Sequence, residues 1–163
     1  HGVELNPDGL DIKQLKQVLA EHAPKLAYTV SNFQNPSGIS YSEDTKRAVA
    51  EVLRGQPTFL VDDDPYGELR FSGTPTTPFY QLLPEQTVIL GSFSKVVVPG
   101  LRLGWIVAPP SLMNKLLIAK QASDLHTSLL PQRIMHAYLS RYSLDQHIQK
   151  IIGEYGRQKD AML

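Results

Sequence analysis

The chain has 163 residues, of which 42% are hydrophobic and 20% are charged, and its 16 basic residues balance its 16 acidic ones. This length suits one ordinary domain with a sizeable core. The absence of cysteine excludes a disulfide framework, a thiolate zinc site and a cysteine nucleophile. The balanced charge and the lack of an apolar run of about 18 residues argue against nucleic-acid and membrane partners. We therefore expect a soluble, cytoplasmic globular protein without a bound metal.

Both ends of the sequence indicate a segment of a larger protein. The chain begins at His1 without an initiator Met. Apolar residues recur at helical spacing from Ile148, and the sequence stops at Leu163 with no Gly, Asn or Pro to close a helix. We therefore treat the chain as one part of a site-bearing protein.

In chain order, the sequence predicts helices that alternate with short apolar strands. Asp11 is a candidate N-cap for a helix that ends before Pro24. Ser40 and Glu43 have the spacing of a capping box for a second helix, and Ser111 is a candidate cap for a third. The remaining predicted elements are a buried strand at 26–30, a turn-rich run at 31–38, a strand at 58–62, a loop at 72–78, strands at 87–91 and 103–108, and helices at 131–141 and from 144 onward.

This alternation predicts an α/β fold with a mostly parallel sheet, because buried parallel strands are rich in unbroken Val, Ile and Leu. The two strands at 87–91 and 103–108 are joined by only about eleven residues, too few for a helical crossover. We expect the last strand to run antiparallel to the one before it. In an open α/β sheet, ligands bind at the carboxyl ends of the strands.

Three motifs lie at these strand ends. Alone, each has an ordinary explanation: a turn, a solvated edge with helix-capping carboxylates, or a surface charge. Their combination in successive loops indicates a site instead. The motifs are Asn35-Pro36-Ser37-Gly38, then Asp62-Asp63-Asp64-Pro65-Tyr66, and then Ser92-Phe93-Ser94-Lys95 followed by Gly100-Leu101-Arg102-Leu103-Gly104.

This ordered set resembles the class I/II aminotransferases, which are pyridoxal-phosphate enzymes of the aspartate aminotransferase fold (fold type I). The sequence is most similar to the 2-aminoadipate and kynurenine aminotransferase branch and to the aminotransferase-like half of MocR-type regulators. The resemblance implies a three-layer α/β/α arrangement. It also implies that residues 1–163 are the central portion of the cofactor-binding large domain, without its N-terminal segment and its C-terminal small domain.

The resemblance also implies a role for each matching residue. Lys95 is the expected catalytic residue: it would form the Schiff base with pyridoxal 5'-phosphate and then move the substrate's α-proton as general base and acid. Asp63 lies three residues before Tyr66, as in the family, and would pair with the protonated pyridine nitrogen. The other cofactor-binding residues that the resemblance implies are Asn35 and Tyr66 at the phenolic oxygen, and Ser92, Ser94 and Arg102 at the phosphate.

The function implied is transfer of an amino group between an amino acid and a 2-oxo acid by a ping-pong Schiff-base mechanism. The family also implies a role in amino acid metabolism and biosynthesis, and a homodimeric full-length protein. Two alternatives on the same fold stay open: a sensor module of a MocR-type transcription regulator, and a pyridoxal-phosphate-dependent lyase. The residues of the Asn-Phe-Gln-Asn-Pro-Ser-Gly stretch favour the enzyme over the regulator.

Local patterns suggest three unrelated alternatives. Ser92 to Lys95 matches the Ser-x-x-Lys motif of penicillin-binding proteins, but that motif opens a helix, three β-branched residues follow Lys95 here, and the partner motifs Ser-Asp-Asn and Lys-Thr-Gly are absent. A phosphate-binding P-loop lacks its Gly-Lys-Ser/Thr arrangement. The three aspartates at 62–64 could hold magnesium only with further oxygen ligands.

Overall fold

The computed structural model describes residues 1–162 and divides them into two compact units. The first unit comprises residues 1–64, 76–90 and 106–113, and the second comprises residues 65–75, 91–105 and 114–162. Leu163, to which the sequence predicts that the last helix extends, lies outside the described residues.

The first unit is built on three parallel strands, as the sequence predicts. β3 (Leu26–Thr29) pairs with β4 (Phe59–Asp63), and β4 pairs with β5 (Thr87–Ser92). The register places Thr29 opposite Asp62 and Asp63 opposite Leu90. β6 (Gly104–Val107) completes the strand order β3-β4-β5-β6. The α/β class and the mostly parallel sheet are therefore confirmed.

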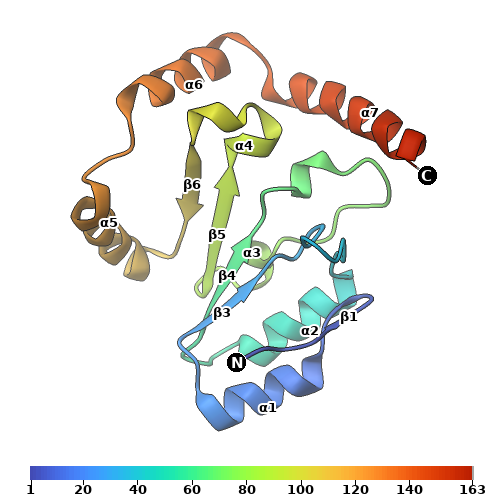
Figure 1. Cartoon of the computed structure of the whole chain (residues 1–163). Coiled ribbons are helices and arrows are strands. Elements are labelled where there is room, and N and C mark those ends of the chain that lie inside the picture. The colour runs from blue at the N-terminus through green and yellow to red at the C-terminus, as the bar shows by residue number, and fades with distance from the viewer. Residues whose placement is uncertain (163) are drawn as a thin grey trace. The chain divides into compact units, whose positions relative to one another are not determined.

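Two helices cover one face of this sheet (Figure 1). α1 (Ile12–His22) begins as predicted at Asp11, whose side chain accepts a hydrogen bond from the Gln14 amide. The cap of α2 (Glu43–Leu53) was predicted wrongly: Ser42, not Ser40, accepts from the Thr45 amide. The Ser40 hydroxyl instead accepts from the Phe33 amide, because it lies outside the first helical turn.

The core of the first unit fills the space between the helices and the sheet. Its members are Leu15, Tyr41, Val49, Ala50, Leu53, Leu60, Phe79 and Leu83. The short helix α3 (Phe79–Leu82) completes this core, and the Phe79 side chain is fully buried. Burial of these apolar side chains is the main stabilising contribution to the unit.

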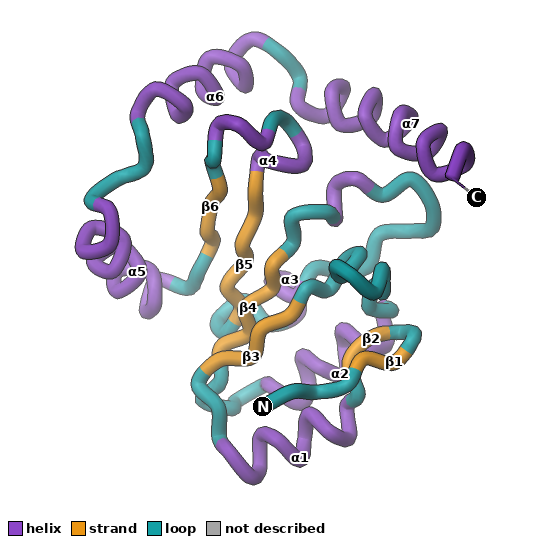
Figure 2. Tube along the Cα trace, in the orientation of Figure 1, coloured by secondary structure: helices purple, strands orange, loops and turns teal. Residues whose placement is uncertain are grey.

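The N-terminal residues form a small hairpin that the sequence analysis did not predict (Figure 2). β1 (Leu5–Asn6) pairs antiparallel with β2 (Gly9–Leu10). Gly9 has φ +128°, and a Cβ there would lie 2.8 Å from the Thr45 Cγ2. Only glycine combines that backbone conformation with so close an approach to α2.

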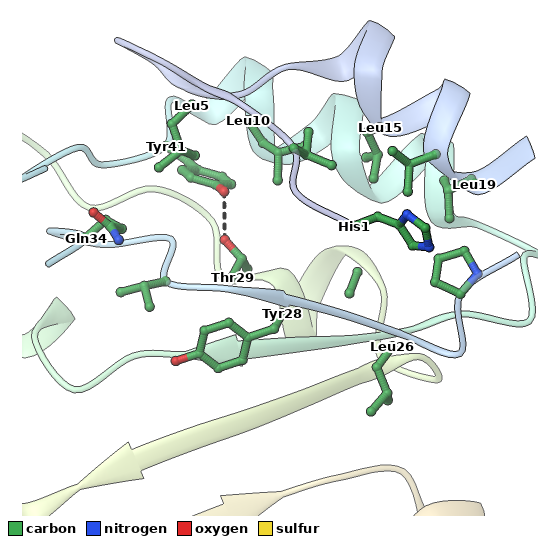
Figure 3. A pocket seen from close by; sticks show the side chains of 15 residues that line it. His1, Leu5, Leu10, Leu15, Leu19, Leu26, Tyr28, Thr29, Gln34 and Tyr41 are labelled. Carbon is green, nitrogen blue, oxygen red and sulfur yellow. Dashed lines mark hydrogen bonds between the residues drawn. The ribbon is translucent and has the colours of Figure 1, made fainter. Parts of the chain in front are cut away.

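β3 is not the buried strand that the sequence predicts. Its residues alternate, so Thr29 faces the helices whereas Leu26 and Tyr28 are 59% and 62% exposed on the other face. Figure 3 shows this alternation: Thr29 points to the Tyr41 hydroxyl, and Leu26 and Tyr28 lie on the opposite side of the strand. The side chains drawn in Figure 3 line a groove beside β3 and are mostly apolar. The groove has a volume of about 470 Å³.

The second unit contains the turn of β5 into β6 and most of the C-terminal helices. The Phe93 amide donates to the Leu103 carbonyl, and a Cβ on Gly104 would lie 3.0 Å from the Gly91 carbonyl. Phe93 is thus paired with Leu103, and Gly91, earlier in the chain, lies beside Gly104, later in the chain. β6 therefore runs antiparallel to β5, as predicted. The unit also contains η1 (Gly67–Leu69), α4 (Phe93–Val96), η2 (Pro99–Leu101), most of α5 (Pro110–Asp124), α6 (Leu129–Arg141) and α7 (Leu144–Met162).

Two details of this region differ from the prediction. α5 begins at Pro110, so Ser111 lies inside the helix and does not precede it. Trp105, which lies in the apolar strand predicted at 103–108, is 44% exposed and not buried, and its indole packs against the backbone of Gly91. Among residues 1–162, none of the helices combines the length and the apolar character needed to cross a membrane.

Candidate active site

The three consecutive aspartates at the end of β4 have three different environments. Asp62 follows the alternation of β4 onto the helix-covered face and is 4% exposed. Asp63 lies on the opposite face, where its Oδ2 accepts a hydrogen bond of 2.6 Å from the Tyr28 hydroxyl. Asp64 accepts from the Asn32 side-chain amide at 2.8 Å. Of the three, Asp63 is the one on the face away from the helices.

This divergence bears on the magnesium alternative. A magnesium site needs several oxygen ligands that converge on one point. The three carboxylates are instead directed to Tyr28, to Asn32 and into the helix-covered face. In the part of the chain that the structure describes, no group of three or more His, Asp or Glu side chains is placed to hold a metal ion.

Asp62 belongs to a buried polar cluster beneath the strand ends. Burial raises the pKa of the Asp62 carboxyl to about 6, although polar groups of Ser31 and the ammonium of Lys46 favour its ionised form. Lys46 is 1% exposed and reaches in from α2, with its Nζ 5.6 Å from the centre of the Phe79 ring. Burial also raises the pKa of the Tyr41 hydroxyl, which accepts a hydrogen bond from Thr29. This cluster is structural, because it faces α2.

The raised pKa of Asp62 predicts a pH dependence of stability. Between pH of about 4 and 6 the folded chain binds a proton at Asp62 that the unfolded chain has released, so the free energy of unfolding falls as pH rises through this range. The pKa difference corresponds to about 3 kcal/mol in all. Replacing Asp62 with Asn is expected to remove this slope. Urea unfolding at several pH values measures it.

The exposed residue Asp160 offers a matched control for that experiment. Its carboxylate is on the last turns of α7 and pairs with the neighbouring Lys159, and its side chain is 73% exposed. Asp160→Asn should leave the slope between pH 4 and 6 as it is in the wild type. A wild-type slope retained by Asp62→Asn would show that another group titrates there.

Asn35 lies in the loop that follows β3. Gln34 organises this turn: its carbonyl accepts from the Gly38 amide at 2.6 Å, and its side-chain oxygen accepts from both the amide and the hydroxyl of Ser37. The left-handed φ of +73° at Gly38 closes the turn. Ser37 and Gly38 therefore shape the loop, as predicted, and leave Asn35 exposed at its tip.

Lys95 lies in α4, a single helical turn at the end of β5, although three β-branched valines follow it in the sequence. Ser92 caps this turn, because its hydroxyl accepts from the Ser94 amide at 3.1 Å. Val96 anchors the turn and is 8% exposed, whereas Lys95 is exposed. The three valines disfavour a longer helix but do not prevent one turn. Because Ser92 begins a helical turn, the requirement that a Ser-x-x-Lys motif open a helix does not exclude that alternative. The absence of the partner motifs Ser-Asp-Asn and Lys-Thr-Gly does exclude it.

Within the second unit, Lys95 and Tyr66 approach each other. The Lys95 Nζ lies 5.8 Å from the centre of the Tyr66 ring, within the range of a cation–π contact. Tyr66 immediately precedes η1. Within residues 1–162, no salt bridge of Lys95 with a carboxylate forms, so the amine is not neutralised by an acidic side chain.

Arg102 also lies in the second unit, on the segment that returns from α4 to β6. It ends η2 in the left-handed region, with φ +52°, and its guanidinium donates to the Pro99 carbonyl at 3.3 Å. The hydrogen bond from the Phe93 amide to the Leu103 carbonyl joins the two segments. The structure therefore places Tyr66, Ser92, Ser94, Lys95 and Arg102 in the second unit, and Asn35 and Asp63 in the first.

The sequence analysis did not identify two residues that lie next to candidate site residues, Tyr28 and Gly91. In the sequence, Tyr28 is one aromatic residue of a predicted strand. In the structure its hydroxyl donates a hydrogen bond to Asp63, 35 residues away. Gly91 directly precedes Ser92, and a Cβ on it would lie 2.1 Å from the Trp105 ring. A glycine inside a predicted strand, with a tryptophan in the next one, is the available sequence signal for such a close approach.

These observations define a class of protein: an α/β fold with a mostly parallel sheet, and with an exposed lysine, hydroxyls and a guanidinium on the segments next to a strand end. The sequence model of the class I and II aminotransferase family matches residues 4–160, and the chain therefore belongs to this family.

Relatives and solved structures agree with this assignment. The chain is 40% identical, over 99% of its length, to aromatic-amino-acid aminotransferase 1 of Thermococcus litoralis. It is 36% identical to kynurenine aminotransferase of Pyrococcus horikoshii, solved in complex with PMP, with a TM-score of 0.91 over 98% of this chain. It is 32% identical to LysN, the α-aminoadipate aminotransferase of Thermus thermophilus complexed with N-(5'-phosphopyridoxyl)-L-leucine, with a TM-score of 0.92 over 98% of this chain.

The chain spans about 40% of the length of these relatives: 40%, 41% and 42% respectively. It is also 32% identical, over 94% of its length, to the HTH-type transcriptional regulator YcxD of Bacillus subtilis, of which it covers 35%. Aminotransferases and regulators thus share this part of the fold.

Proposed function

We propose that this chain is part of a pyridoxal-phosphate-dependent aminotransferase, which transfers an amino group between an amino acid and a 2-oxo acid. The observation that carries the proposal is the exposed Lys95, one helical turn beyond β5 and 5.8 Å from the Tyr66 ring, in a chain of the aminotransferase family. The chain spans about 40% of its relatives, so the activity is proposed for the whole protein.

The chemistry of the donor set fits pyridoxal 5'-phosphate. A phosphate needs hydrogen-bond donors and positive charge, which the hydroxyls of Ser92 and Ser94 and the guanidinium of Arg102 supply. Lys95 supplies an amine for the aldehyde. The relatives solved with PMP and with a phosphopyridoxyl amino acid support the same cofactor. When bound, the cofactor supplies an aldehyde for Lys95 and a ring that withdraws electrons from the substrate's α-carbon.

In the proposed mechanism, Lys95 is the residue that acts. Its amine would hold the cofactor covalently. When free, the Lys95 amine would remove the proton from the substrate α-carbon and return a proton as general acid. The adjacent Tyr66 ring restricts where the lysine side chain can lie. One group therefore serves both halves of a ping-pong reaction.

The other proposed residues hold and orient the cofactor. Asp63 would place a carboxylate against the ring nitrogen and so favour the protonated form of that nitrogen. Asn35 and Tyr66 would hydrogen-bond the phenolic oxygen. Ser92, Ser94 and Arg102 would hold the phosphate. The family resemblance supplies these roles, and the position of Asp63 on the face away from Asp62 supports choosing it among the three aspartates.

Further properties of the whole protein are proposed on the same footing. Residues 1–163 would be the central portion of the cofactor-binding large domain. The relatives named for aromatic amino acids, kynurenine and α-aminoadipate suggest large amino acid substrates and a role in amino acid metabolism. A homodimer and a cytoplasmic location remain predictions, and sedimentation of the full-length protein would test the dimer.

A regulator module is the second candidate, favoured by the match to YcxD. Such a module would bind the same cofactor through the same lysine, so binding does not separate the two candidates. Catalytic turnover does: an aminotransferase converts many equivalents of amino acid and 2-oxo acid, whereas a sensor binds its ligand without sustained turnover.

Borohydride labelling of the longest natural form of this chain tests the cofactor assignment. We expect reduction after addition of pyridoxal phosphate to attach a phosphopyridoxyl group to Lys95, which peptide mass spectrometry would locate. Prior addition of an amino acid substrate should remove the label, because the substrate amine displaces the lysine. Label scattered over surface lysines such as Lys120, with none enriched at Lys95, would refute the assignment.

A further inference from the structure

The register of the sheet places Tyr28 and Asp63 on the same face. Tyr28 lies opposite Val61 in the parallel pairing of β3 with β4, and Asp63 is two residues beyond Val61. Side chains two residues apart on a strand share a face. Thr29 and Asp62 occupy the other face, with the helices, and Figure 3 shows Tyr28 pointing away from the Thr29–Tyr41 hydrogen bond.

The Tyr28 hydroxyl donates to the Asp63 Oδ2 over 2.6 Å. This distance is typical of a hydroxyl bonded to an ionised carboxylate, which is stronger than a bond between neutral groups. The bond joins two strands across a rigid sheet and restrains the rotation of the carboxylate.

The neighbouring aspartates do not compete for this contact. Asp64 is bound by Asn32, and Asp62 is buried on the opposite face. Of the three aspartates, the Tyr28 hydroxyl thus contacts Asp63, the one that the proposed function assigns to the ring nitrogen of the cofactor. A carboxylate in that role must keep its orientation, since the groups that support a site residue determine how well it is placed.

We propose that Tyr28 is a positioning residue that orients the Asp63 carboxylate toward the cofactor. The inference rests on the proposed function, because it assigns Tyr28 a role through Asp63. Tyr28→Phe removes the hydroxyl and keeps the aromatic ring, so it opens no core cavity. The effect of Tyr28→Phe should therefore fall on cofactor binding and not on folding.

The experiment measures pyridoxal phosphate affinity of the longest natural form by equilibrium titration, and unfolding of the cofactor-free protein. Tyr28→Phe is expected to weaken cofactor binding by about tenfold, as loss of a hydrogen bond to a charged group does, with unfolding unchanged. Tyr80→Phe, which removes the hydroxyl of a 42% exposed tyrosine of the same unit, should change neither quantity.

A double-mutant cycle then shows whether Tyr28 acts through Asp63. In an Asp63→Asn background, Tyr28→Phe is expected to cause no further loss of cofactor affinity. An equal loss in both backgrounds, unchanged affinity of the single variant, or a loss explained by unfolding would overturn the inference alone. A wild-type protein that binds no pyridoxal phosphate would overturn the proposed function and the inference together.

Discussion

Replacing Lys95 with alanine is expected to lower kcat for transamination by at least about a thousandfold in the longest natural form of the protein. The substitution removes both the amine that would hold the cofactor and the group that would move the α-proton, and a positioned general base alone contributes about 100- to 10,000-fold. Coupled assay of 2-oxo acid formation measures the loss. Lys95→Arg should be similarly inactive, because a guanidinium keeps the charge but is not a nucleophile.

The matched control is Lys120→Ala. Lys120 is an exposed lysine of the same unit, on α5, where its ammonium binds Asp124 at 2.6 Å. Loss of this surface ion pair should change stability by less than about 1 kcal/mol and leave turnover unaffected. Near-normal turnover by Lys95→Ala, or an equal loss in Lys120→Ala, would contradict the assignment of Lys95.

The parallel strands could be predicted from the sequence because their signal is local. The apolar runs at 58–62 and 87–91 read as buried strands, and the structure has them as β4 and β5 with bounds shifted by one residue. The cap of α2 shows the limit of local reading. Ser40 and Ser42 are equally good capping residues, and only the backbone decides that the helix begins at Glu43 and takes Ser42 as its cap.

The choice among the three aspartates could not be derived from composition or spacing alone. Adjacent carboxylates are alike in sequence, and the interval to Tyr66 selects Asp63 only through the family resemblance. The strand register supplies the physical reason afterwards: alternation directs Asp62 into the helix-covered face and Asp63 out of it. Tyr28 could not be predicted because its partner depends on pairing between segments 35 residues apart.

The one-turn helix that carries Lys95 was missed for a different reason. Helix propensity is a weak guide over four residues, because a single turn depends on its cap and its anchoring side chain more than on its sequence average. Ser92 supplies the cap and Val96 the buried anchor. Gly91 directly precedes the capping residue Ser92, so we expect a substitution at Gly91 to disturb this helical turn.

Gly91→Ala is expected to destabilise the protein by about 1–3 kcal/mol, as overpacking does. The added Cβ would lie 2.1 Å from the Trp105 Cζ2 and 2.2 Å from its Cε2, far inside van der Waals contact, so a rigid indole or the strand must move. The backbone of Gly91 is not in the left-handed region, so the cost comes from the contact itself. Urea unfolding of the chain measures it.

A double-mutant cycle with Trp105→Ala isolates this contact. Without the indole the added methyl group has room, so Gly91→Ala in the Trp105→Ala background is expected to cost less than about 0.5 kcal/mol. The same cost in both backgrounds would show that the indole is not what excludes a side chain. Because Ser92 and Lys95 follow Gly91 directly, labelling of Lys95 by pyridoxal phosphate and borohydride should fall in the single variant and recover when Trp105 is also replaced.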